Sequence, residues 1–177
     1  MAERNVTDID WARWLTWGAA AGVGAGAAFL AVTMWFATSM GDPARGPLLM
    51  ISTIVQGDEA MMNGTASVGI GVAVHIALSA LFGVVFALLV SRIRTDGALA
   101  LAGALYGTAL YVLNFKVIAP AVFPVFEMAN QPFELAVHVV FGAVLALVLI
   151  GVSGARRTSS VPDTGQTAPL SARAGRI

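Results

Sequence analysis

The two histidines of the chain, His75 and His138, both lie inside long apolar segments. Each lies ~8–11 Å from the same end of its segment at about 1.5 Å per helical residue, so their depths match. An ionisable side chain within a membrane-spanning helix is a functional candidate by default. The matched pair is therefore the first place in this sequence to look for chemistry.

Three arrangements fit the pair. The first is haem b held between His75 and His138 as axial ligands, which needs imidazoles at equal depth and flat walls of small residues. The second is two neutral histidines that form hydrogen bonds, His138 with Glu134 one turn away and His75 with Asn114. Asn114 and Glu134 are predicted to form a polar cluster at the outer side. The third is a metal or proton path. No spacing here matches a known metal pattern, so no metal ligands are assigned.

Catalytic motifs are absent from the sequence. It has no Gly-x-Ser-x-Gly elbow, no His-Glu-x-x-His and no phosphate-binding loop. It has no cysteine, which excludes thiol catalysis, disulfides and iron–sulfur clusters. Carboxylates are absent from the centres of the apolar segments, which argues against an ion-coupled pump. No catalytic residues are predicted.

The composition indicates a membrane protein. Of the 177 residues, 58% are hydrophobic and 11% charged, where soluble domains carry about 25% charged residues. The mean hydropathy is +0.81. A helix needs about 20 apolar residues to cross the bilayer, and four segments qualify. They are residues 14–36, 68–90, 98–118 and 133–152.

The basic residues predict the orientation. Of the ten, only Arg45 and Lys116 fall on one side of the predicted spans. The positive-inside rule then places both termini in the cytoplasm, and the expected location is the bacterial inner membrane. The predicted organisation is a cytoplasmic tail at 1–13, a four-span domain at 14–152 and a disordered cytoplasmic tail at 153–177, which is rich in Ser, Gly, Pro, Thr and Arg.

The two halves of the four-span domain resemble each other. Residues 72–90 and 135–150 both contain Ala-Val-His, then Phe-Gly, then a run of Ala, Leu and Val. The predicted fold is therefore an all-α bundle of two αα repeats, each with a long outside segment. In the first segment, apolar residues of 43–57 recur at helical spacing between Pro43 and Gly57, which predicts a short interfacial helix. The second, 119–132, is expected to be irregular.

Small residues recur at four-residue spacing in every predicted span. Such stripes let membrane helices approach closely, and they also leave room for a flat ligand. The stripes predicted to pack helices contain Gly18, Gly22, Gly26, Gly71, Ser79, Gly83, Gly103, Gly107 and Gly142.

Residues 42–57, 73–83, 111–124 and 134–142 carry a resemblance to a known group. They read DPARGPLLMISTIVQG, AVHIALSALFG, YVLNFKVIAPAVFP and ELAVHVVFG. The chain resembles small, functionally uncharacterised four-helix inner-membrane proteins of bacteria with paired His…Phe-Gly helices. Some of these carry the label sodium:proline symporter, although four spans lack the helices of such a symporter. The resemblance implies that His75, Asn114, Phe115, Pro124 and His138 belong to the group's pattern, and it implies no chemistry.

The sequence favours a non-catalytic accessory or structural subunit that packs against a larger membrane complex. The glycine-striped helices, the apolar outside segments and the missing catalytic set favour it. One alternative is a redox subunit with haem b on His75 and His138. Another is a small-solute channel or carrier that acts as an oligomer. The predicted partners are the lipid bilayer and other membrane subunits or copies of this chain, and no nucleic acid.

Overall fold

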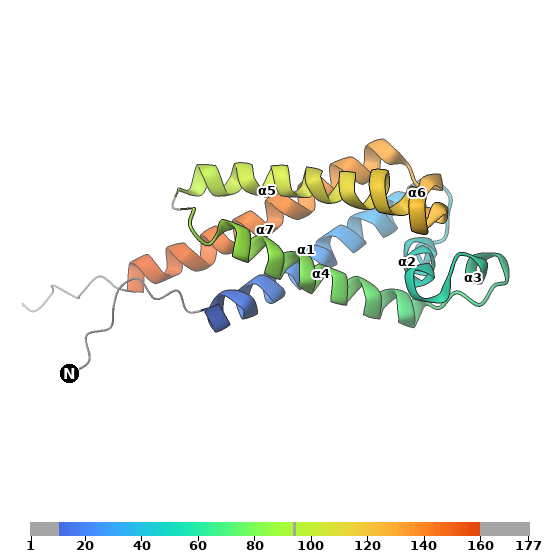
Figure 1. The fold of residues 1–177 in the computed structure, drawn as a ribbon, viewed down its shortest axis with the longest axis horizontal. Coiled ribbons are helices and arrows are strands. Elements are labelled where there is room, and N and C mark those ends of the chain that lie inside the picture. Colours follow the sequence, from blue (N-terminus) through green and yellow to red (C-terminus); the bar gives the residue numbers. More distant parts are fainter. Residues whose placement is uncertain (1–10, 94, 160–177) are drawn as a thin grey trace, which may run out of the picture.

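The fold consists of helices throughout the part of the chain that the structure describes, residues 11–93 and 95–159 of a computed structural model (Figure 1). Four helical segments are long and apolar enough to cross a membrane. The predicted all-α membrane fold with four spans is confirmed, and the chain is a multi-pass membrane protein.

The spans begin and end close to the predicted positions. Two of them start at a hydroxyl cap, because Ser67 accepts a hydrogen bond from the backbone of Ile70 and Thr95 accepts one from Ala98. The third span is not a uniform α-helix, since a π-helix and a short α-helix follow its first part. The spans are α1 (Trp11–Ser39), α4 (Val68–Val90), α5 (Asp96–Tyr111) with η1 (Val112–Ile118) and α6 (Ala119–Val122), and α7 (Gln131–Ser159).

The last helix is longer than predicted. α7 continues through Ser159, into the segment that was expected to be disordered from residue 153 onward. Ala155, Arg156 and Arg157 are strong helix formers, so the helix propagates beyond the apolar stretch. The rest of that tail, and residues 1–10 of the other tail, lie outside the described residues.

The spans form two tightly packed pairs, α1 with α4 and α5 with α7. In the first pair, a Cβ atom on Gly22 would collide with the carbonyl oxygen of Ser79. In the second, a Cβ atom on Gly103 would collide with the carbonyl oxygen of Gly142. Each half therefore seats a glycine-striped helix on its histidine-bearing helix, as the predicted repeat requires.

The two pairs meet mainly through α1 and α7. Phe36 of α1 stacks on Phe133 of α7 with ring centroids 3.8 Å apart. A second link joins α4 and α5, where the Tyr106 hydroxyl donates to the carbonyl oxygen of Phe82 at 2.8 Å. The buried apolar core lies between the pairs and includes Ala25, Phe86, Leu110, Phe141 and Leu145.

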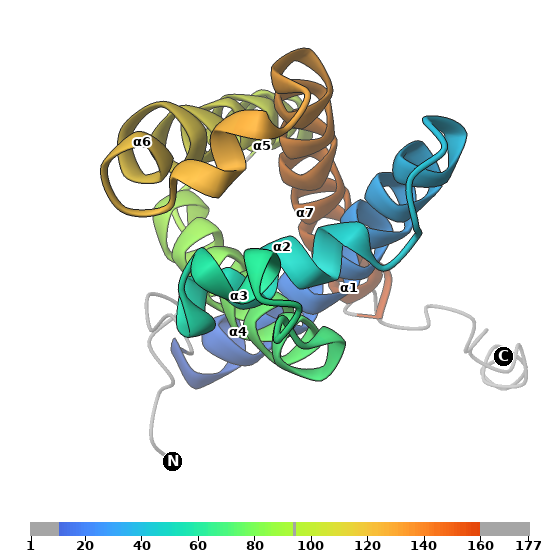
Figure 2. The same cartoon turned by 90° about the vertical axis from the view of Figure 1, so that its right-hand side faces the viewer.

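Short helices cover one end of the bundle, which we call the capped end (Figures 1 and 2). They are α2 (Gly46–Gln56), α3 (Glu59–Met62) and η2 (Pro124–Met128), and they lie at the same end as α6, the last part of the third span. The α2 helix is the short helix predicted in the first outside segment, but it begins at Gly46, with Pro47 and not Pro43 in its first turn. It ends before Gly57, whose φ is +80°. The second outside segment, expected to be irregular, is largely helical. The backbone N–H of Val125 donates to Oδ2 of Asp58 at 3.2 Å and ties the two outside segments together.

Candidate ligand-binding site

A cavity of about 340 Å³ lies between the two halves, toward the capped end. Its volume is within the range of small-molecule sites, about 300–1,000 Å³. Both halves contribute to it, and α2 lies over it with Pro47, Met50, Ile51 and Ile54. Apolar and aromatic side chains form most of its wall.

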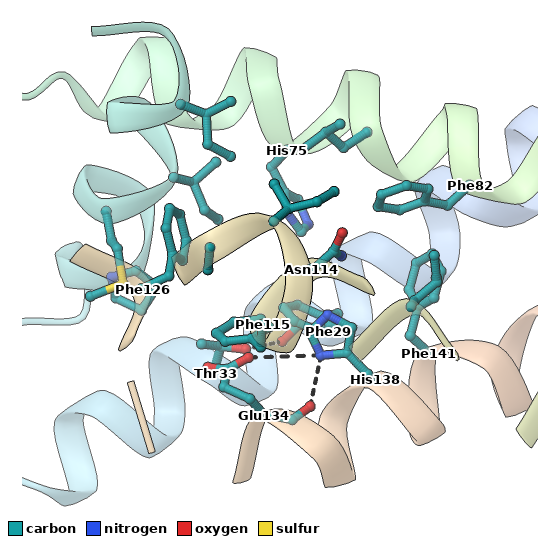
Figure 3. A pocket seen from close by; sticks show the side chains of 18 of the residues that line it. Phe29, Thr33, His75, Phe82, Asn114, Phe115, Phe126, Glu134, His138 and Phe141 are labelled. Carbon is teal, nitrogen blue, oxygen red and sulfur yellow. Dashed lines mark hydrogen bonds and ion pairs between the residues drawn. The ribbon is translucent and has the colours of Figure 1, made fainter. Parts of the chain in front are cut away.

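Four polar side chains predicted from the sequence line this one cavity (Figure 3). His75 comes from α4, Asn114 from η1, and Glu134 and His138 from α7. The sequence analysis predicted matched depths for the two histidines and a polar cluster of Asn114 and Glu134 at the outer side, and in the structure all four line the same cavity. The buried members are Glu134 and His138, with 8% and 7% of their surfaces exposed.

His75 forms a hydrogen bond between helices. Its Nε2 lies 2.8 Å from the carbonyl oxygen of Gly26, so Nε2 carries the proton and donates. The prediction that His75 bonds Asn114 is therefore wrong. The reason is the glycine stripe, because α1 approaches α4 so closely at Gly26 that its carbonyl oxygen comes within reach.

His138 bonds within its own helix. Its Nδ1 lies 2.7 Å from the carbonyl oxygen of Glu134, so Nδ1 is the donor. The same nitrogen lies 3.8 Å from the Glu134 carboxylate, too far for a hydrogen bond. Glu134 is the predicted partner of His138, but the hydrogen bond is to its backbone carbonyl and not to its side chain.

Aromatic rings surround the buried polar pair. Phe29 meets His138 edge to face with ring centroids 5.0 Å apart, and Phe115 does the same at 5.4 Å. Phe29 also lies 5.9 Å from the ring of His75 and 6.3 Å from that of Phe141. One phenylalanine of α1 therefore contacts histidines from both halves of the molecule.

The arrangement does not fit haem b. A bis-histidine haem needs both imidazoles to direct a free nitrogen at one iron. His138 has the pattern of a metal ligand, with Nδ1 on a carbonyl oxygen and Nε2 free. His75 has the reverse, since its Nε2 is held by Gly26, and the ring of Phe29 packs against both imidazoles. Among the residues that the structure describes, no group of three or more His, Cys, Asp or Glu could hold a metal ion.

The predicted packing residues lie at helix contacts. A Cβ atom on Gly71 would collide with the carbonyl oxygen of Leu48, which seats α2 on α4. The other members of the stripes lie between the paired spans: Gly18, Gly22 and Gly26 against Ser79 and Gly83, and Gly103 and Gly107 against Gly142 and its neighbours.

Two features of the site were not foreseen. One is the cover by α2, although the helical spacing of Met50, Ile51 and Ile54 signalled an apolar face that needed a partner. The other is the π-helix η1, which carries Asn114 and Phe115 at the cavity wall. π-helical turns often occur at functional sites, but their sequences resemble those of α-helices.

Comparison of the chain with protein-family models, curated proteins and solved structures finds no match. The functional assignment therefore depends on the cavity and its chemistry.

Proposed function

We propose that this protein is a non-catalytic membrane protein that binds a small amphipathic molecule in the cavity between its two halves. The observation that carries the proposal is a cavity of ligand size that gathers the polar side chains of His75, Asn114, Glu134 and His138 within aromatic walls. Ligand sites have this composition, an apolar lining with a few convergent polar groups.

Two of the polar groups are available to a ligand. The described residues offer the side-chain amide of Asn114 no hydrogen-bond partner, and the same holds for the hydroxyl of Ser79. A polar group in an apolar, membrane-embedded site costs free energy unless it is paired. A ligand with one polar head and an apolar body would pair them and fill the remaining space. This role differs from those expected from the sequence, and it is nearest to the small-solute channel or carrier that acts as an oligomer.

The proposal can be tested with 4-phenyl-1-butanol and 4-phenylbutylamine, which pair a phenyl ring with one polar head. The protein is reconstituted in lipid nanodiscs, and binding is measured with isotope-labelled compounds after correction for uptake by protein-free nanodiscs. We expect saturable binding of at least one compound. Asn114→Phe, which fills the cavity, should abolish it. Val117→Phe lies on the same π-helix but faces outward at 56% exposure, and should leave binding unchanged.

Absence of saturable binding for both compounds would overturn the proposal, as would equal binding by Asn114→Phe. The accessory-subunit role remains a prediction, since large apolar side chains exposed on all four spans are covered equally well by lipid or by a protein. Recovery of a stable larger complex in mild detergent would support it.

A further inference from the structure

The charge of the cavity wall narrows the class of ligand. Glu134 is the one acidic residue among the described residues that line the cavity, and no lysine or arginine lines it with them. Lys116, on the same π-helix as Asn114, is held elsewhere, because its Nζ donates to Oε1 of Gln131 at 2.9 Å. The Glu134 carboxylate therefore has no fixed cationic partner in the cavity.

The nearby histidine does not supply that partner. Nδ1 of His138 already donates to the backbone carbonyl oxygen of Glu134, and a neutral imidazole satisfies this bond. The carboxylate lies beyond hydrogen-bond distance of the same nitrogen. A buried carboxylate without a cation or several donors beside it is costly and takes up a proton instead, so a bound cation would stabilise its ionised form.

The histidines also determine which kind of hydrogen bond the cavity can make. Each donates a ring N–H to a backbone carbonyl, His75 through Nε2 to Gly26 and His138 through Nδ1 to Glu134. In the neutral ring the other nitrogen is then an acceptor. When Glu134 is ionised, its carboxylate and the two free histidine nitrogens are acceptors only, whereas Asn114 and Ser79 can donate or accept. The acceptor-only groups are paired by a ligand that donates hydrogen bonds.

The aromatic walls favour the same class. Phe29 and Phe115 lie beside His138, one helical turn from Glu134 (Figure 3). A cation is attracted to the faces of aromatic rings, most strongly where water is excluded. A carboxylate, hydrogen-bond acceptors and phenylalanine rings in one cavity together match a protonated amine on an apolar body.

We infer that the ligand of this cavity is a lipophilic organic ammonium ion, which donates its N–H groups to Glu134 and the free histidine nitrogens. The inference rests on the proposed function, because it names the ligand class of that same site. A neutral amphipathic ligand is the competing outcome.

The test compares three ligands that share a phenyl ring and a short carbon chain. At pH 7 the head is cationic in 4-phenylbutylamine, neutral in 4-phenyl-1-butanol and anionic in 4-phenylbutanoate. In nanodiscs we expect the ammonium to bind about 10-fold or more tightly than the alcohol, and the carboxylate most weakly. Glu134→Gln should reduce the preference for the ammonium to within about 3-fold. Glu127→Gln, an exposed acidic residue of η2 outside the cavity, should preserve it.

Alcohol binding keeps the two proposals separate. If Glu134→Gln still binds the alcohol normally, the variant is folded and any loss is specific to the cation. Equal affinity of the native protein for ammonium and alcohol would overturn the inference and leave the proposed function standing. An unchanged ammonium preference in Glu134→Gln would also overturn it. If no compound binds saturably, the proposed function itself fails.

Discussion

The hydrogen bond between His75 and Gly26 links two helices at the edge of the cavity. A side chain that donates to a backbone carbonyl of another helix both stabilises the contact and fixes its own ring. The second effect matters for binding, because it determines which nitrogen faces a ligand as an acceptor.

Replacing His75 should cost a measurable but modest amount of stability. Hydrogen bonds between membrane helices contribute about 0.6 kcal/mol on average and at most about 1.7 kcal/mol. We expect His75→Leu to lower the free energy of unfolding by an amount in this range, measured by titration with sodium dodecyl sulfate in mixed micelles. Ile76→Leu is the matched control, since Ile76 is 47% exposed and faces away from the contact. Equal stability of the two variants would show that the bond contributes nothing.

The polar residues of the site could be named from the sequence, but the partner of His75 could not. Ionisable and amide side chains within apolar segments stand out by type, so His75, Asn114, Glu134 and His138 were identified. Hydrogen-bond partners depend on how closely two helices approach. That distance is set by which glycines face each other.

At the level of helices, the glycine stripes determine how the spans pair. Gly22 and Gly24 lie on the same helix, yet only Gly22 faces α4. A Cβ atom on Gly22 would lie 3.0 Å from the Cα atom of Gly83 and closer still to Ser79, whereas one on Gly24 would meet no heavy atom within 4 Å. The same residue type thus has two roles within one turn.

We expect Gly22→Leu to separate α1 from α4 and destabilise the protein by about 1–3 kcal/mol, the usual cost of overpacking. Gly24→Leu places the same side chain in open space and should change stability by less than about 0.5 kcal/mol. The two variants can be compared in the same detergent titration. A loss in Gly24→Leu as large as that in Gly22→Leu would refute the assigned packing.

The positions of the helices could be predicted from the sequence, but the type of each helix could not. The four spans follow from apolar length, and α2 follows from the helical spacing of its apolar residues and from Gly57 as an end signal, although it begins at Gly46 and not at Pro43. The π-helix of Val112–Ile118 could not be foreseen, because it differs from an α-helix only in hydrogen-bond register. The π-helix carries Asn114 and Phe115, which line the cavity. This part of the site could not be predicted, because amino-acid composition does not distinguish a π-helix from an α-helix.

For the whole molecule, the two ends of the bundle differ in what they present. The start of α1, the connection between α4 and α5 and the end of α7 lie together, opposite the capped end (Figure 1). The positive-inside rule predicts that the end opposite the capped end faces the cytoplasm.

Single cysteines can test this orientation, because the native chain has none and is its own control. Met62 and Met128 are 79% and 78% exposed at the capped end, and Gly97 is exposed near the opposite end. In intact cells, a membrane-impermeant maleimide should label Met62→Cys and Met128→Cys. Gly97→Cys should react only after the membrane is permeabilised. The reverse labelling pattern would invert the predicted topology.

The repeat has a consequence for the charge of the cavity. Aligning His75 with His138 pairs Gly71 with Glu134, since each lies four residues before its histidine. In one half the glycine admits the backbone of α2, and in the other the carboxylate lines the cavity. A symmetric dimer of identical two-span chains would carry either two carboxylates or none. Because both halves belong to one chain, the two positions can differ, and the cavity is lined by a single acidic side chain.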